Sequence, residues 1–522
     1  MRYWGAAAIA VVVGWYAFAL AVLHPLANGP VIDSWIYNES VRWFLATGQF
    51  RFVGYTETMP VAQVVYGAAW GALFGTSAIS LDLANVALGI VTALMLYALA
   101  LRCGAQAWQA LAASSLLICN PCFLFLSFSF MSEIAFLAAL LGSLLAFANA
   151  EGPHPMRWLW ISAGFGVVAF AVRPFGGIAI LGAVGAILIY ERKDRATMLA
   201  PFAFALVACG LIWWWLTILR PPPWKLLQRK AILASFFEVA PWEYLRMGII
   251  GPLLYLGIVL SPLALLRVMK TIRFALALAV GIFAITLILV RIGSSLPATP
   301  EMSCFGGWSN ALILHGLSNR FEWHDRWQYA MALLGSIGAA GLILACVDAT
   351  GRLTRASAAV LIASAIYWIA VVPLWFFNDR YFLVLVPAAA LILATAPLPE
   401  RMPTRIAAFA MTAVMGLMSL GGTYAYQRGL SAVIATRDML EQRGIARASI
   451  DAGYALNGME LYPFPDGDDS SVPMITSSKL SEYTVASSPI AGTEIVGTFA
   501  WPGPFGFRKR ELYVLRRSVP PN

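Results

Sequence analysis

Long apolar runs, separated at short intervals by charged, proline or turn residues, recur along most of this chain. Each run is close to twenty residues long and carries few charges, which is enough to cross roughly 30 Å of hydrocarbon as a helix. We count about 13 predicted spans, near residues 4–23, 79–101, 107–126, 130–149, 157–173, 175–190, 197–219, 247–267, 272–291, 327–347, 356–377, 381–397 and 404–424. A shorter apolar run at 61–75, rich in Gly and preceded by Pro60, is predicted to lie at the membrane interface or dip into it.

Four longer segments lie between or after the apolar runs, at residues 24–60, 220–246, 292–326 and from about 425 to the end. With the N-terminus inside the cell, an odd number of crossings places all four segments outside. Every inner connection is then short and basic, as the positive-inside rule expects. The bases of these connections lie at Arg2, Arg102, Arg157, 191–195, 267–273, 350–355 and 399–405. We therefore expect a multi-pass protein of a bacterial-type cytoplasmic (inner) membrane, with its functional residues in the long outer segments.

The tail differs from the rest of the chain in its pattern. A helix-like stretch, "GLSAVIATRDMLEQRGIA", is followed by the strand-like runs "ASID", "EIVGTFAW" and "ELYVLRR", which Gly, Pro, Asp and Ser separate. We predict two parts: a transmembrane domain at 1–424, whose outer loop 24–78 carries interfacial helices, and a small extracytoplasmic α/β domain at 425–522. The first apolar run is interpreted as an uncleaved span because no small-residue cleavage site follows it. The expected fold class is an all-α polytopic membrane protein with a small C-terminal α/β domain.

Composition narrows the function classes. Hydrophobic residues make up 60% of the chain and charged residues only 12%, which excludes a water-soluble globular protein. The net charge of +9 comes from bases scattered between apolar runs and not from a continuous basic stripe, so nucleic acid is not an expected partner, whereas anionic lipid or phosphate is. Cys119 and Cys122 have CxxC spacing, but no second ligand pair follows, so neither a metal nor a redox role is indicated.

Two carboxylates are the first candidate catalytic residues. Residues 33–47, "DSWIYNESVRWFLAT", predict an amphipathic helix at the membrane surface that Asp33 begins and Gly48 ends. Glu133, in "FSFMSEIAFL", also suits a helix N-terminus, so the simpler interpretation is that both residues only cap helices. Because both lie at the same predicted membrane face, they could instead divide roles as general base and second acid. Joint binding of a divalent metal by the two carboxylates is left open, and no other cofactor is indicated.

Bases at the same predicted face form the second group. Arg173 in "AVRPFGG" and Arg380 in "FNDRYFLVLVP" interrupt apolar sequence, where an ionisable residue is functional unless its head reaches the interface. Arg220 and Lys225 lie among aromatic residues in "RPPPWKLLQRKAIL". Such bases often only anchor a helix to lipid head groups. A site that releases a phosphate would need them to stabilise the leaving charge.

The order of these motifs resembles that of the GT-C-fold glycosyltransferases, the bacterial relatives of protein O-mannosyltransferases and of the aminoarabinose transferase that modifies lipid A. The family pattern is Asp-x-x-x-Tyr near a Gly-Arg/Gln-Phe, then a Pro-rich entry to a short helix that ends in Phe-Gly. Here Asp33 and Tyr37 match the first motif, and 48–50 match the second. "FMSEIAF", "VRPFGG", "DRYFLVLVP" and the tail segment "IDAGYALNGMELY" resemble later family motifs. The chain departs from the family at "TETMPVAQ", where Thr58 and Met59 stand in place of the usual Pro-Pro or basic-Pro pair beside Glu57.

The resemblance implies transfer of a sugar from a polyprenyl-phosphate carrier to a lipid, glycan or protein acceptor outside the membrane, with inversion at the anomeric carbon. It makes Asp33 the general base and Glu133 a second acidic group. The candidate substrate-binding residues are Tyr37, Glu57, Arg173, Arg220, Lys225, Arg380 and Tyr381, of which the resemblance places Arg173 and Arg380 on the phosphate side. Two other classes stay open from the sequence: a transporter or flippase of lipid-linked or amphipathic substrates, and a scaffold whose tail binds a partner. The first would place charges near the bilayer midplane, whereas most charges here flank the spans.

Overall fold

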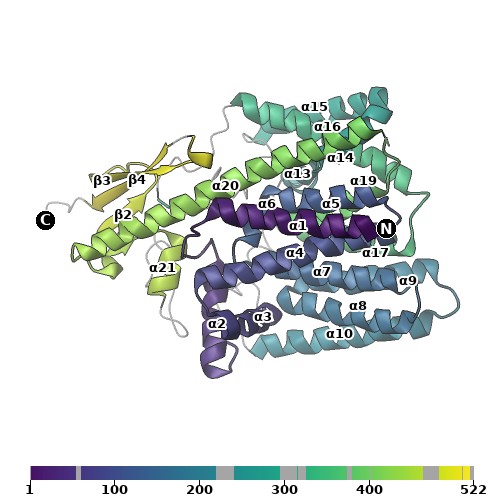
Figure 1. The fold of residues 1–522 in the computed structure, drawn as a ribbon, viewed down its shortest axis with the longest axis horizontal. Helices are drawn as coiled ribbons and strands as arrows, with labels where there is room; N and C mark the ends of the chain where they lie inside the picture. The colour runs from purple at the N-terminus through teal and green to yellow at the C-terminus, as the bar shows by residue number, and fades with distance from the viewer. Residues whose placement is uncertain are drawn as a thin grey trace.

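A bundle of apolar helices carries a small β-sheet at one end, which we call the sheet end (Figure 1). The computed structural model describes residues 2–53, 60–218, 240–293, 314–315, 325–372, 379–399, 401–462, 481–507 and 509–517, and the structural statements below concern these residues. The principal helices before residue 220 are α1 Arg2–Leu23, α2 Ser34–Thr47, α3 Val61–Phe74, α4 Ala78–Arg102, α5 Ala107–Cys119, α6 Pro121–Ser127, α7 Ser132–Asn149, α8 Pro155–Val172, α9 Gly177–Tyr190 and α10 Arg195–Ile218.

The second half of the bundle contains shorter and more broken helices, together with one very long helix. The principal ones are α13 Gly251–Val259, α14 Ser261–Lys270, α15 Ile272–Gly293, α16 Asp325–Ala349, α17 Arg355–Val371, α18 Asp379–Phe382, α19 Val386–Thr395, α20 Met402–Gln442 and α21 Tyr454–Leu461. α13 and α16 cross so closely that a Cβ on Gly257 would lie 2.0 Å from the carbonyl oxygen of Gly335. Small residues at such crossings allow the backbones to approach, as is typical of helices packed in a membrane.

The predicted spans have counterparts throughout the described bundle. Eight helices are long and apolar enough to cross a membrane alone. Two pairs of helices, α5 with α6 and Tyr244–Val259 with α14, are each bent at a short break and add two spans if each pair is counted as one. Shorter apolar helices at Pro174–Tyr190, Arg355–Val371 and Arg380–Thr395 match the remaining predicted runs. A further short apolar helix, α3, matches the run predicted not to cross. The chain is therefore a multi-pass helical membrane protein, as predicted.

The tail contains a four-stranded sheet in the order β1-β2-β4-β3. Its strands are β1 Ile450–Asp451, β2 Tyr483–Ala486, β3 Thr493–Pro502 and β4 Lys509–Arg517. β1 is parallel to β2, and β4 is antiparallel to both β2 and β3. β3 has a bulge between Ile495 and Gly497. The predicted small C-terminal α/β part is thus confirmed, although the pattern analysis missed β2.

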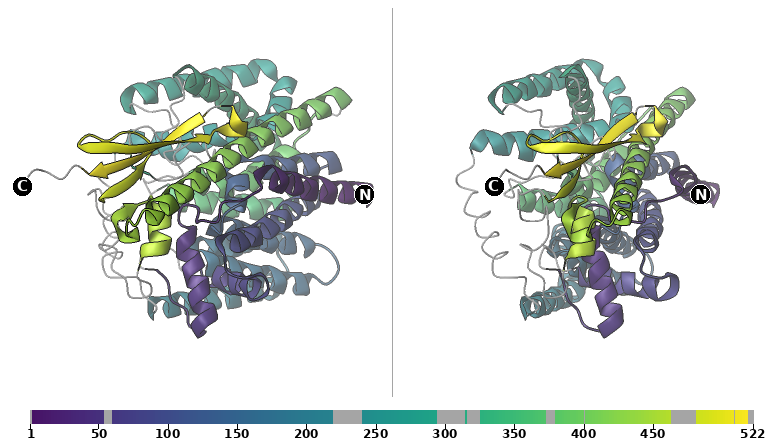
Figure 2. Two further views of the ribbon diagram at one scale, coloured as in Figure 1. Left: turned by 60° about the vertical axis from the view of Figure 1, so that its left-hand side comes forward. Right: turned by 90° about the vertical axis from the view of Figure 1, so that its left-hand side faces the viewer.

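The helix α20 joins the bundle to the sheet without a break. It has 41 residues, so at 1.5 Å per residue it is about 62 Å long, roughly twice the hydrocarbon thickness. It runs through the predicted domain boundary at residues 424 and 425, and the stretch predicted as a separate tail helix forms its second half. Figures 1 and 2 show the sheet lying along this second half. The tail is consequently held by a rigid continuation of the last span.

Candidate active site

Four charged side chains from separate parts of the chain meet at the sheet end of the bundle. Arg380 lies between two carboxylates, with its Nη1 3.2 Å from Asp33 Oδ2 and its Nε 3.5 Å from Glu133 Oε1. Arg173 Nη2 donates a 2.6 Å hydrogen bond to the same Glu133 oxygen. Positive and negative groups therefore alternate from Asp33 to Arg173, and the four charges sum to zero. We call these four residues the charged cluster.

Asp33 belongs to this cluster and does not cap α2. It occupies the position before the helix, but its side chain makes no capping hydrogen bond. The carboxylate instead accepts hydrogen bonds from Arg380 and from the hydroxyl of Tyr454. The preceding residue, Ile32, has φ of 49°, which is a strained conformation for a β-branched side chain and costs about 1–3 kcal/mol. The capping interpretation of Asp33 is therefore wrong, and the chain stores strain immediately before this carboxylate.

Glu133 lies in the first turn of α7, where the helix dipole favours a negative charge. Its side chain is 2% exposed, and that of Arg173 is 11% exposed. Arg173 also donates from Nε to Ser132 Oγ at 2.9 Å, so its guanidinium is fixed against two consecutive residues of α7. The turn that presents Arg173 requires glycine, because a Cβ on Gly176 would lie 2.1 Å from the backbone carbon of Ala169. The Glu133–Arg173 pair is thus a buried, rigid part of the cluster.

Arg380 is oriented by its neighbours in sequence and by α17. Its guanidinium carbon lies 5.8 Å from the ring centroid of Tyr381, a cation–π distance. The backbone carbonyl of Tyr381 accepts a 3.0 Å hydrogen bond from the hydroxyl of Tyr367, which lies on α17. The predicted residue Tyr381 therefore supports Arg380 in this structure.

Two tyrosine side chains border the cluster. Tyr37 is buried one turn into α2 and makes a hydrogen bond with Ser132; its burial raises the pKa of the phenol, an effect that nearby Arg173 opposes. Tyr454, from α21, donates a 2.9 Å hydrogen bond to Asp33 Oδ1 across 421 positions of sequence. Sequence reasoning did not select Tyr454 as a site residue. The available signal was its place in "IDAGYALNGMELY", which was noted only for its family resemblance.

α21 reaches the cluster because it packs directly on α2. A Cβ on Gly458 would lie 2.3 Å from the ring of Trp35, so only glycine allows the two helices to approach this closely. The start of α21 is held by Asp451, whose Oδ1 accepts hydrogen bonds from the backbone of Gly453 and from Asn457 Nδ2. The other oxygen of Asp451 lies 3.0 Å from His315 Nε2, so this histidine joins the tail and not the charged cluster.

Two buried amide side chains, Gln63 and Asn85, fix the loop that leads to Glu133. Gln63 donates to the carbonyl of Phe130, and Asn85 donates to the carbonyls of Ser129 and Met131. These side chains come from α3 and α4, so both helices anchor residues 129–131. The position of Glu133 thus depends on buried hydrogen bonds that no span prediction could reveal.

Three predicted substrate-binding residues, Glu57, Arg220 and Lys225, lie outside the described residues. Among those described, no group of three or more His, Cys, Asp or Glu side chains is placed to hold a metal ion. The guanidinium of Arg380 already lies between Asp33 and Glu133. A divalent cation bound by both carboxylates would have to displace it, so this arrangement does not fit the metal site that the sequence left open.

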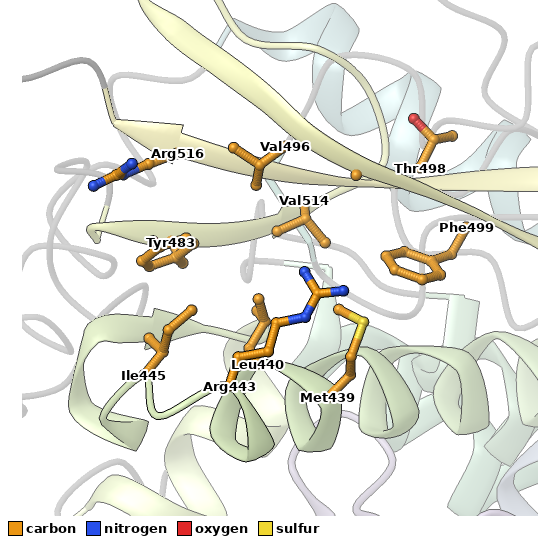
Figure 3. A pocket seen from close by; sticks show the side chains of 11 residues that line it. Met439, Leu440, Arg443, Ile445, Tyr483, Val496, Thr498, Phe499, Val514 and Arg516 are labelled. Carbon is orange, nitrogen blue, oxygen red and sulfur yellow. The ribbon is translucent and has the colours of Figure 1, made fainter.

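A cavity of about 420 Å³ lies between the end of α20 and the sheet (Figure 3). Arg443 points from α20 toward Val514 across this cavity, and Arg516 lies at its edge. No residue of the charged cluster lines it. The cavity is therefore separate from the candidate active site.

Comparison with known proteins gives structural likenesses only. No protein-family model matches the chain, and no curated protein sequence matches it. Among solved structures, the archaeal oligosaccharyltransferase AglB from Archaeoglobus fulgidus, in complex with an inhibitory peptide and a dolichol-phosphate, aligns at 15% identity with a TM-score of 0.45 over 84% of this chain. The chain spans 58% of the length of AglB.

Two further structures illustrate the range of these likenesses. ArnT from Cupriavidus metallidurans, bound to undecaprenyl phosphate, aligns at 15% identity with a TM-score of 0.40 over 98% of this chain and 99% of its own. The arabinosyltransferase EmbB from Mycobacterium smegmatis aligns at 14% identity with a TM-score of 0.36 over 85% and 43%. These three proteins are glycosyltransferases, the class of enzyme that the sequence motifs resemble. At these identities and TM-scores they define neither the family nor the activity of this chain.

Proposed function

We propose that this protein is an integral-membrane, GT-C-type glycosyltransferase. It moves a sugar from a polyprenyl-phosphate carrier to an acceptor outside a bacterial-type cytoplasmic membrane, with the N-terminus inside and the sheet outside. The charged cluster carries this proposal: two carboxylates and two guanidiniums meet where the spans end and an interfacial helix begins. A lipid-linked phosphate sugar needs such a place, because its tail stays in hydrocarbon while its head reacts in water.

The two carboxylates have different exposures, which supports different roles. The Asp33 side chain is 24% exposed, and that of Glu133 is 2% exposed. In the proposed reaction Asp33 accepts the proton of the acceptor hydroxyl, which then attacks the anomeric carbon opposite the leaving phosphate. General-base catalysis of this kind contributes about 10²–10⁴-fold. Glu133 does not reach the acceptor and instead holds Arg173 and Arg380 in place.

The guanidiniums take the phosphate side of the reaction. As the bond between sugar and phosphate breaks, negative charge grows on the phosphate oxygens, and Arg380 and Arg173 donate hydrogen bonds to it. Arg380 donates a hydrogen bond to Asp33 Oδ2. Phosphate that draws Arg380 toward itself also frees Asp33 Oδ2 to accept a proton, so donor binding prepares the base. Inversion follows because a single displacement takes place.

The proposal is tested by the lipid-linked sugars and glycoconjugates of cells that carry the wild-type or an altered gene. Mass spectrometry should show one glycan feature lost, and its polyprenyl-phosphate donor accumulated, in Asp33→Asn cells. Glu39→Gln is the matched control, because Glu39 lies on the same helix but pairs with Arg42 outside the cluster. An unchanged glycan profile with Asp33→Asn protein present at wild-type levels would contradict the assignment of the base. Unchanged profiles on deletion of the whole gene would contradict glycosyl transfer itself.

A further inference from the structure

The turn between β3 and β4, residues 503–507, holds the most exposed large hydrophobic side chain of the described chain. Phe507 is 89% exposed. Every other large hydrophobic side chain that is more than 60% exposed belongs to a helix of the bundle, where lipid would cover it. Phe507 lies on no such helix. A ring this exposed would be costly in water, so its surroundings need a separate explanation.

The backbone of this turn is strained, and Phe505 packs it against α20. Phe505 has φ of 49° and ψ of 20°, a left-handed conformation that bulky residues rarely adopt, and Gly506 follows with φ of 81°. The ring of Phe505 stacks on Tyr424 with centroids 6.3 Å apart. The Phe505 ring also packs against α20 at Gly421, where a Cβ would lie 2.5 Å from the ring. The turn is thus pinned to α20 by Phe505, and Phe507 projects from a fixed base.

The depth of the turn follows from the contacts of α20 with the end of α1. Arg428 Nη2 donates to the carbonyls of Leu23 and His24, so Arg428 is level with the residue at which the first span ends. The same guanidinium lies 4.8 Å from the ring centroid of Tyr424, so that ring is at the same level, and Gly421 lies about one helical turn, roughly 5 Å, further toward the bundle. Phe505 contacts both. The turn therefore lies level with the last turns of a membrane span, and Figures 1 and 2 show it beside α20 at the base of the sheet.

We propose that the β3–β4 turn is a membrane wedge, which inserts Phe507 into the bilayer leaflet next to the sheet end. Phe, Trp and Leu are the side chains that interfacial segments bury at the boundary between hydrocarbon and head groups. Exposed Lys509 follows Phe507 by two residues and lies where it can meet anionic head groups. Arg428, whose guanidinium lies 4.8 Å from the ring centroid of Tyr424, adds a second base at the same level. The sheet is then attached to the membrane twice, by α20 and by this turn.

Photo-crosslinking in the intact protein tests the proposal, independently of the proposed function. Phe507 is replaced by p-benzoylphenylalanine, and the protein is placed in nanodiscs of equal parts phosphatidylglycerol and phosphatidylethanolamine. The matched control carries the same group at Ile495, which is 49% exposed on β3 and about 24 Å along the strand from its membrane-proximal end at Pro502. After irradiation, mass spectrometry should find phospholipid adducts on the Phe507 variant at least tenfold more often than on the control.

Three results would overturn the wedge. They are adducts between two copies of the chain at Phe507 in place of lipid, equal lipid labelling at both positions, and no adduct at Phe507 while the same group placed at Phe204, 67% exposed on α10, is labelled by lipid. A second variant, Phe507→Asp, tests the same idea without photochemistry. A buried carboxylate would be expelled from the leaflet, so the turn should become more exposed to hydrogen exchange in nanodiscs. Unchanged exchange of residues 503–509 in this variant would also contradict insertion.

Discussion

The buried pair Glu133–Arg173 should couple more strongly than an exposed pair, and a double-mutant cycle measures this. The changes are Glu133→Gln, Arg173→Gln and both together. Two unit charges about 4 Å apart attract by about 4 kcal/mol at an effective dielectric constant of 20. Loss of one partner from a buried pair costs about 3–5 kcal/mol, because the remaining charge stays buried. The Glu133 and Arg173 side chains are only 2% and 11% exposed, so they form a buried pair of this kind.

The expected coupling energy is about 2–3 kcal/mol, because Arg380 also contacts Glu133 and keeps part of the compensation. The assay is reversible unfolding in mixed micelles of dodecyl maltoside and sodium dodecyl sulfate, followed by far-UV circular dichroism. The control cycle is Glu39→Gln with Arg42→Gln, a more exposed pair one turn apart on α2, with side chains 21% and 36% exposed, for which a smaller coupling of about 0.2–1 kcal/mol is expected. A coupling for Glu133 and Arg173 no larger than that of the control pair would refute the description of the cluster as buried and rigid.

Two further changes test how the tail reaches the site. Tyr454→Phe removes only the hydroxyl that donates to Asp33. A charge-assisted hydrogen bond is worth about 1.5 kcal/mol, so the free energy of unfolding should fall by up to about this amount, and turnover should fall because Asp33 loses a group that orients it; an unchanged rate together with an unchanged midpoint would contradict the contact. Gly458→Val introduces side-chain atoms where Trp35 lies, so unfolding should become easier by about 1–3 kcal/mol and transfer should be lost. Gly281→Val, at a position on α15 where a Cβ meets no atom within 4 Å, is the matched control and should neither destabilise the protein nor reduce transfer.

The spans and the interfacial helix were predictable because their causes are local. Apolar runs bounded by charges locate the helices, and α2 ends where Gly48 adopts φ of 70°, as its residue type predicted. Asp33 and Arg380, which the sequence placed at one membrane face, are in contact in the structure. The sequence did not reveal that Arg380 contacts both carboxylates, since this depends on how three separate loops pack.

The contribution of the tail was less predictable. Tyr454 reaches Asp33 only because Gly458 lets α21 approach Trp35, a contact between segments more than 400 residues apart. Periodicity describes which face of a helix is apolar but not which distant helix covers it. β2 was missed for a related reason, since a strand of four residues carries too little alternation to stand out from a loop.

Because helix α20 is unbroken, a tilt of its bundle half also moves the half that carries the tail. Its second half extends about 21 Å beyond Arg428, so a tilt of about 10° within the bundle would move its far end by about 4 Å. This displacement exceeds the length of the 2.9 Å hydrogen bond between Tyr454 and Asp33. A tilt of the last span of this size would therefore change the contact between Tyr454 and Asp33.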